Sequence, residues 1–175
     1  MRQLKIDLSE LERAFEYGSY EIFFYLDLEN GDIITVSEEA FDRVENFYAV
    51  YYNEKSHNLD WEKAFDEQQV NEWEHKVLHE ADLVKRGLGN RFIKIPSQDS
   101  HEGYRDMEAF ISSITDTSLQ EHLERAIVGS GAFRRFKNVL LDFPAERERW
   151  FQFKQARLQQ RIFHWLKSHE ITLIQ

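Results

Sequence analysis

The sequence predicts an α+β fold, with an N-terminal β-hairpin and helices followed by a mostly helical C-terminal part with one or two short strands. Two observations lead to this fold class. Near the N-terminus, two runs rich in β-branched and aromatic residues flank an Asn-Gly pair, which is typical of a hairpin. Over most of the remaining chain, apolar residues recur three and four positions apart, which is the spacing of amphipathic helices.

The first elements follow from capping and turn residues. Ser9 is expected to cap a short helix that ends at Tyr17. Residues 22–28 and 33–36 are the predicted strands, and residues 29–32 join them. Asn30-Gly31 supplies the positive φ angles that a two-residue hairpin turn requires.

Two helices are predicted after the hairpin. Ser37 caps the first, which extends to about Tyr51. The second is a single long helix over residues 60–86, ended by Gly87 and Gly89. Its expected inner stripe consists of Val70, Trp73, Val77, Ala81 and Val84. We therefore expect an acidic hairpin-plus-helix subdomain over residues 1–88 and a neutral helical subdomain carrying a basic cluster over residues 89–175.

The C-terminal part begins with a predicted strand over residues 91–95, which Pro96 ends. Helices are expected after the polar loop 97–100, over residues 118–128, after the turn 129–131, and from Pro144 onward. Residues 171–174 are the candidate for a closing strand, which we expect beside residues 91–95.

Charge and composition exclude several classes of function. The chain has no cysteine, which excludes disulfides, thiol catalysis and cysteine-ligated metal sites. It lacks a signal-peptide pattern and any apolar run near the ~20 residues of a membrane span, so we expect a cytoplasmic protein without membrane contact. The net charge of −10 is unevenly spread: residues 1–90 carry 9 Lys and Arg against 21 Asp and Glu, whereas residues 129–167 carry 9 against 3. Such opposite fields suit docking on a second copy or on an anionic ligand.

The basic cluster lies in the helix that follows Gly131. Its apolar positions fall on one face and are expected in the core: Ala132, Phe133, Phe136, Val139 and Leu140. Arg134, Arg135 and Lys137 lie on the opposite side and have no acid three or four residues away. The helix start at Gly131 offers free N–H groups, the usual ingredient of an anion site. The alternative is that these cations pair with acids elsewhere in the fold.

The last helix repeats this pattern. Lys154, Arg157 and Arg161 form a narrow stripe with Trp150 as an apolar neighbour, and no acid lies at helical spacing from these cations. Beside the stripe runs an apolar face that we expect in the core: Phe151, Leu158, Ile162, Trp165 and Leu166. The stripe fits a helix that contacts phosphates or a carboxylate-rich partner. It fits equally well arginine stems that cover the edge of a core.

Other patterns predict no chemistry. His75 and His79 are spaced for a shared metal, but Lys76 stands where the zinc-protease pattern requires Glu, so no metal is predicted. The glycines at 129 and 131 match no phosphate-binding or dinucleotide fingerprint, so no cofactor is predicted. The acids around Arg105, at positions 102, 106 and 108, are interpreted as a surface charge run.

Several strings resemble the bacterial uncharacterised protein family 0158. They are residues 92–100, 104–108, 129–137 and 149–151, together with the hairpin segment 25–32. The string from Gly129 to Lys137 is the most specific of them. Because that family has no established activity, the resemblance implies no substrate, cofactor or catalytic residue. It leads us to expect acids or Arg at four places where this chain has Asn138, Lys154, Ala156 and His164.

The preferred hypothesis is a non-enzymatic binding or regulatory protein. Its anion-facing surface would bind RNA, a nucleotide or an acidic protein segment through Gly131, Arg134, Arg135, Lys137, Lys154, Arg157 and Arg161. One alternative is an enzyme that acts on a small phosphorylated substrate, with acid–base work by His101, Glu102 or His122. Another is a structural protein whose basic helices dock on its own acidic part or on a second copy, as in a homodimer.

Overall fold

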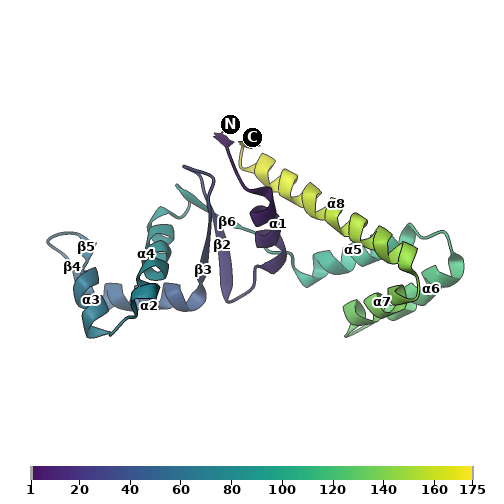
Figure 1. Cartoon of the computed structure of the whole chain (residues 1–175), viewed down its shortest axis with the longest axis horizontal. Helices are drawn as coiled ribbons and strands as arrows, with labels where there is room; N and C mark the ends of the chain where they lie inside the picture. The colour runs from purple at the N-terminus through teal and green to yellow at the C-terminus, as the bar shows by residue number, and fades with distance from the viewer. Residues whose placement is uncertain (1, 175) are drawn as a thin grey trace. The chain divides into compact units, whose positions relative to one another are not determined.

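The computed structural model describes residues 2–174 and confirms the α+β class. Two compact units divide the chain. Unit 1 contains the residues up to Ser97 and those from Glu170 onward, and unit 2 is Gln98–His169. Figure 1 shows both units and labels most of their elements.

A three-stranded antiparallel sheet forms the centre of unit 1. The predicted hairpin is confirmed as β2 (Ile22–Asp27) and β3 (Ile33–Ser37), and β6 (Phe92–Ile95) pairs with the other edge of β2. In the register, Tyr25 lies opposite Ile34 on one side and opposite Lys94 on the other. The central strand β2 is therefore paired along both edges, which satisfies its backbone groups.

The hairpin loop differs from the predicted two-residue turn. The last pair is closed by a bond of 2.8 Å from the N–H of Asp27 to the carbonyl of Asp32, so four residues lie between them. The N–H of Gly31 donates to the carbonyl of Asp27 at 2.9 Å, and Gly31 has a φ of 85°. Glycine is needed here because a Cβ at this position would lie 2.2 Å from the carbonyl oxygen of Lys5.

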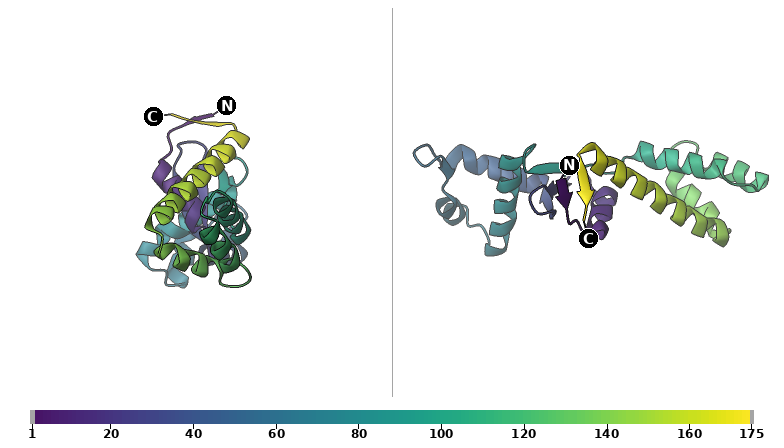
Figure 2. Two further views of the ribbon diagram at one scale, coloured as in Figure 1. Left: turned by 90° about the vertical axis from the view of Figure 1, so that its right-hand side faces the viewer. Right: turned by 90° about the horizontal axis from the view of Figure 1, so that it is seen from above.

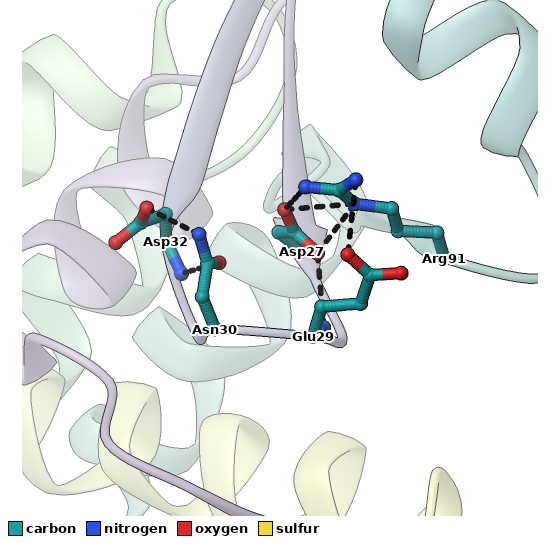
Figure 3. A network of polar contacts seen from close by, with 5 residues as sticks. All are labelled: Asp27, Glu29, Asn30, Asp32 and Arg91. Atoms are coloured by element: carbon teal, nitrogen blue, oxygen red, sulfur yellow. Dashed lines mark hydrogen bonds and ion pairs between the residues drawn. The ribbon is translucent and has the colours of Figure 1, made fainter.

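A buried carboxylate ties this loop to the residue before β6 (Figure 3). Asp27 is 1% exposed and accepts hydrogen bonds from Nε and Nη2 of Arg91, the latter at 2.7 Å. The same guanidinium pairs with Glu29 at 2.9 Å through Nη1. On the other side of the loop, Asn30 and Asp32 bond to each other. The hydrogen bond to Asp27 raises the pKa of Arg91 further above its usual value, so the guanidinium remains charged.

The closing strand pairs differently from our expectation. β7 (Ile171–Leu173) runs parallel to β1 (Arg2–Leu4) (Figure 2). In this pair Gln3 lies opposite Thr172. The expected pairing with residues 91–95 is wrong because β6 belongs to the hairpin sheet, where it pairs with β2. A third, very short pair joins β4 (Tyr52–Asn53) to β5 (Asn58–Leu59).

Four helices complete unit 1 over its described residues: α1 (Leu8–Tyr17), α2 (Glu38–Tyr51), α3 (Trp61–Glu67) and α4 (Glu72–Gly87). Asp7, and not Ser9, caps α1, because its carboxylate accepts from the N–H groups of Ser9 and Glu10. Ser37 caps α2 as predicted, through a bond of 3.1 Å to the N–H of Ala40.

The single helix predicted over residues 60–86 is wrong, since the chain breaks between α3 and α4. Gln69 adopts a φ of 49°, which no α-helix accommodates. Asn71 and Glu74 then form a capping box that starts α4 anew. The break changes the buried face: Leu78 and Ala81 are in the core, whereas Trp73, predicted inside, is 72% exposed.

The sheet and its neighbouring helices contribute to one core in unit 1. Its buried members are Tyr25, Val36, Ala40, Val44, Phe47, Tyr51, Leu59, Ala64, Leu78, Ala81, Val84 and Phe92. Arg43 on α2 forms an ion pair with Glu74 on α4, and Tyr48 donates to Asp82 at 2.7 Å. These contacts fasten α2 to α4 beside the apolar core.

Unit 2 consists of α5 (Ser100–Ser112), α6 (Thr117–Ala126), α7 (Ala132–Leu141) and α8 (Pro144–Ser168). Asp99 and Asp116 cap α5 and α6, and Pro144 opens α8 as predicted. The helices enclose a second core of Met107, Phe110, Ile111, Ile114, Leu119, Leu123, Ile127, Ala132, Phe136, Leu140 and Trp150. Phe133 was predicted in the core but is 41% exposed, because it lies at the margin of the helix face over Gly103.

The two units divide the chain differently from the predicted subdomains 1–88 and 89–175. β6 follows residue 88 yet belongs to the sheet of unit 1, and β7 returns from α8 to pair with β1. Among residues 2–174, no helix combines the length and the apolarity needed to cross a bilayer.

Candidate functional site

Arg135, one of the predicted anion-binding residues, binds backbone carbonyls. Its Nε donates to the carbonyl of Ala126 at 2.8 Å, and its Nη groups donate to those of Val128 and Ser130, each at 2.6 Å. These carbonyls belong to the end of α6 and the turn that follows, where the helix leaves acceptors unpaired. The guanidinium thus caps α6 and fixes the turn before α7.

Gly131 lies directly under the same side chain. It is the residue before α7 and has a φ of 79°, which favours glycine. A Cβ at this position would lie 3.1 Å from Nη1 of Arg135. The guanidinium therefore lies against the start of α7, where the sequence suggested an anion.

Arg157 and Arg161 converge on one buried carboxylate. Asp106 on α5 is 1% exposed and accepts from Nε of Arg157 at 3.0 Å and from Nη2 of Arg161 at 2.7 Å. Gln98 donates to the other side of the carboxylate at 3.3 Å, and Glu102 lies 3.8 Å from Nε of Arg161. The interpretation of Asp106 as a surface acid is wrong: two arginines one turn apart on α8 hold it in place and join α8 to α5.

The remaining predicted cations are Arg134, Lys137 and Lys154. Arg134 and Lys137 are exposed on α7, one turn apart, and Lys154 is half-buried on α8. The structure therefore separates the predicted set. Arg135, Arg157 and Arg161 contact groups of unit 2 itself, whereas Arg134 and Lys137 face outward.

A groove between α7 and α8 contains Lys137. Its volume is about 360 Å³, and its lining residues are Lys137, Asn138, Leu140, Leu141, Arg147, Trp150 and Phe151. The helical spacing of Lys137 and Leu141 on α7, and of Arg147 and Phe151 on α8, places one cation and one apolar side chain from each helix at the groove.

The floor of the groove is aromatic and rigid. Trp150 is 7% exposed, and its ring centroid lies 4.8 Å from that of Phe136 and 5.2 Å from that of Phe110, with the rings edge to face in both pairs. Closer to the surface, Phe151 is 49% exposed and Leu141 is 58% exposed. A ligand that covers apolar side chains of this size binds more tightly, because their surface is removed from water.

The rim of the groove is positively charged. The guanidinium of Arg147 lies 5.4 Å from the centre of the Phe151 ring, which holds it beside the apolar surface. In the part of the chain that the structure describes, neither Lys137 nor Arg147 forms an ion pair with a carboxylate. The nearby acids on α8 have other contacts: Glu146 pairs with Arg149 at 3.1 Å, and Glu148 accepts from Gln152 at 3.2 Å.

The residues proposed for catalysis lie outside this groove. His101, Glu102 and His122 are on α5 and α6, and none of them lines it. Among residues 2–174, the groove lining includes no carboxylate and no imidazole. The arrangement can hold an anion over an apolar surface, but it offers no group for proton transfer near neutral pH.

The histidines spaced for a metal pack against aromatic rings of unit 1. His75 stacks on Phe65 with ring centroids 3.9 Å apart, and His79 lies 4.3 Å from Trp61. Burial lowers the pKa of His79, which favours its neutral form. Within residues 2–174, no group of three or more acids and histidines is placed to hold a metal ion.

The groove and both basic helices lie in a segment that a family model recognises. That model describes an uncharacterised protein family, UPF0158, and matches residues 75–175. The chain belongs to the UPF0158 family. The resemblance seen in the sequence is thereby confirmed.

Among relatives in UPF0158, a protein of Pseudomonas aeruginosa, PA5073, is 23% identical over 98% of this chain and 87% of its own length. Two further UPF0158 proteins, from Chlamydia muridarum and Chlamydia trachomatis, are 25% and 26% identical over 76% of this chain. The matched part is 35% of the length of each chlamydial protein. No solved structure is significantly similar.

Sequence reasoning missed half of the groove. Arg147 was not among the predicted site residues, and Phe151 was assigned to the core with the apolar face that includes Leu158 and Ile162. A signal was present in the spacing: Arg134, Lys137 and Leu141 recur along one face of α7, and Arg147 and Phe151 along one face of α8. Which of these faces meet in space depends on the turn between the helices.

Proposed function

We propose that this UPF0158 member is a non-enzymatic binding protein whose α7–α8 groove takes an acidic protein segment bearing an apolar or aromatic side chain. One observation carries the proposal: two cations, Lys137 and Arg147, flank an aromatic floor in a groove of about 360 Å³ without a lining carboxylate. Interfaces gain most of their affinity where an aromatic anchor fills a pocket, and surrounding charges add orientation and speed of association.

An acidic protein segment fits the groove better than RNA. Single-stranded RNA is held by a row of phosphate contacts and by several rings on which bases stack. Of the two aromatic residues lining the groove, Trp150 is 7% exposed, and only Phe151 presents enough ring for stacking. The net charge of −10 would also repel a long polyanion, whereas a short acidic segment meets mainly the local field.

The test uses a synthetic fluorescein-labelled peptide in which a single tryptophan lies among glutamates. We expect the double variant Lys137→Ala/Arg147→Ala to bind this peptide about tenfold more weakly than the wild type, equivalent to ~1.4 kcal/mol. Phe151→Ala should also weaken binding, because it removes apolar contact and frees Arg147 from its ring. Anisotropy titrations at two salt concentrations measure both effects.

A matched control separates the groove from general charge. Arg105→Ala/Arg125→Ala removes two exposed cations of unit 2 that do not line the groove, so it should bind like the wild type. A peptide with alanine in place of tryptophan should bind more weakly than the parent. If this control and the groove variant lose affinity equally, the groove is not the site. If oligouridylate binds the groove more tightly than the peptide does, the ligand class is RNA and the proposal is wrong.

A further inference from the structure

Unit 1 displays a tryptophan that its own fold does not cover. Trp73 on α4 is 72% exposed, and Val77, one turn further along the same face, is 37% exposed. Isolated apolar side chains are common on protein surfaces, but tryptophan is enriched at the centres of protein interfaces, where it contributes much of the binding free energy. The break before α4 directs these side chains outward, since the capping box at Asn71 sets where the new helix begins.

The surroundings of Trp73 are acidic. Glu72 and Glu74 flank it in the sequence, and Glu80 lies two turns further along, where it also pairs with the exposed Lys76 at 3.7 Å. Glu74 is held by Arg43 and Asn71, and the pairing lowers its pKa, so that it remains ionised at neutral pH. We call Trp73, Val77, Glu72 and Glu80 the acidic tryptophan patch. It has the chemistry that the α7–α8 groove is expected to bind: an aromatic anchor with carboxylates beside it.

From this complementarity, and resting on the proposed function, we infer that the groove is occupied by the acidic tryptophan patch of a second copy of the chain. The indole of Trp73 would cover Phe151 and Leu141, and Glu72 and Glu80 would lie toward Lys137 and Arg147. The volume of about 360 Å³ lies within the range of sites that enclose small groups, ~300–1,000 Å³. The buried ring of Trp150 provides a rigid base for the contact.

The uneven distribution of charge along the chain fits the same pairing. Residues 98–169 carry 11 Lys and Arg against 10 Asp and Glu, whereas the rest of the chain carries 11 against 22. At close range this asymmetry orients unit 1 of one copy toward the basic helices of the other, while the net charge of −10 on each chain opposes approach in other orientations. The two surfaces are unlike, so two arrangements are possible: two copies exchange the contact reciprocally in a two-fold dimer, or a one-way contact continues from copy to copy.

The test is complementation between two full-length variants. Glu72→Ala/Trp73→Ala removes the patch and keeps the groove, and Lys137→Ala/Arg147→Ala removes the groove and keeps the patch. We expect the wild type to self-associate in sedimentation velocity. Each variant alone should have a dissociation constant at least about tenfold higher. The mixture should form a pair of one copy each, joined by the single intact contact.

The control for the patch is Tyr20→Ala, which removes an aromatic side chain of unit 1 that is 94% exposed, and it should associate like the wild type. A second measurement follows Trp73 directly by fluorescence. Its emission is the difference between the spectra of the wild type and Trp73→Phe, and the emission maximum should shift to shorter wavelength as the protein concentration rises. A wild type that is monomeric at all concentrations overturns the inference, as does association that both variants retain. If the inference fails but the glutamate–tryptophan peptide still binds the groove, the proposed function stands. If the peptide does not bind either, both the inference and the proposed function are wrong.

Discussion

Two neighbouring arginines on α7 differ completely in their surroundings. The guanidinium of Arg135 donates to carbonyls at the end of α6 and in the following turn, while that of Arg134 faces outward. Hydrogen bonds from charged groups to otherwise unpaired acceptors are worth more than those between neutral groups. The adjacent positions therefore offer a comparison in which residue type and helix are the same and only the contacts differ.

We predict that Arg135→Ala lowers the free energy of unfolding by about 2 kcal/mol, because it leaves the carbonyls of Ala126, Val128 and Ser130 without this donor. Arg134→Ala should change it by no more than about 0.5 kcal/mol, as is usual for exposed side chains. Urea unfolding followed by circular dichroism measures both. Equal effects of the two variants would mean that the cap adds nothing to stability.

A tyrosine between α2 and α4 gives a prediction about pH. Burial and the hydrogen bond to Asp82 raise the pKa of Tyr48 to about 12. Because the unfolded chain ionises this side chain near the ordinary tyrosine pKa of 10.0, its contribution to stability is present below pH 10 and is lost between pH 10 and 12. The difference in unfolding free energy between wild type and Tyr48→Phe should therefore shrink over this range, as measured by urea titrations at several pH values. A constant difference would show that Tyr48 ionises as freely in the folded state as in the unfolded one.

At the scale of elements, buried ion pairs within unit 2 hold α8 against α5. Asp106 is buried, and Arg157 and Arg161 reach it from successive turns of α8. Removing one partner of a buried ion pair leaves the other partner's charge without compensation. Here the arginines retain some water, since their side chains are 41% and 21% exposed.

We accordingly predict that Asp106→Ala destabilises unit 2 by about 3 kcal/mol, at the lower end of the range for broken buried pairs. Asp106→Asn should cost less, because the amide keeps the shape and one acceptor. Glu121→Ala, which removes an exposed acid from the same unit, is the matched control and should leave the melting temperature nearly unchanged. A loss no larger than that of the control would contradict the role assigned to Asp106.

The elements show what local sequence determines. Hairpin strands, α2, α5, α6, α7 and α8 were predictable because their apolar spacing and caps agree with the final fold. The break at Gln69 was not, because the Schellman motif that ends α3 usually has glycine at this left-handed position and here has glutamine. Strand pairing was equally hidden: β6 and β7 are both short and apolar, and only the whole fold determines which edge each one meets.

The candidate site follows the same logic. Helical periodicity placed the cations of α7 and α8 on polar faces, which correctly separated them from most of the core. It did not reveal that Arg135 turns back to the end of α6, or that Asp106 lies under α8, since both contacts join different elements. The absence of acids at helical spacing fits two arrangements equally well. The cations can pair with distant groups of the fold, or they can bind a ligand.

At the scale of the whole molecule, the boundary between the units determines which pieces can fold. β6 supplies the second pairing edge of β2, and Arg91 before it compensates the buried Asp27. Both follow residue 88, the end of the subdomain expected from sequence, and both precede Gln98, the start of unit 2. A fragment that ends at residue 88 keeps the hairpin but loses the partners of its central strand.

We predict that the fragment 1–97 unfolds cooperatively on heating and that the fragment 1–88 does not. Without Arg91, the carboxylate of Asp27 would be buried unpaired, at a cost of about 3–5 kcal/mol, and one edge of β2 would be open. Both fragments lack β7, so the loss of its pairing with β1 affects them equally.

Fragment 98–169, which contains the complete second core, should melt cooperatively by itself and still bind the glutamate–tryptophan peptide. Circular dichroism melts and anisotropy titrations provide the measurements, and cooperative melting of 1–88 at the temperature of 1–97 would place the boundary back at residue 88.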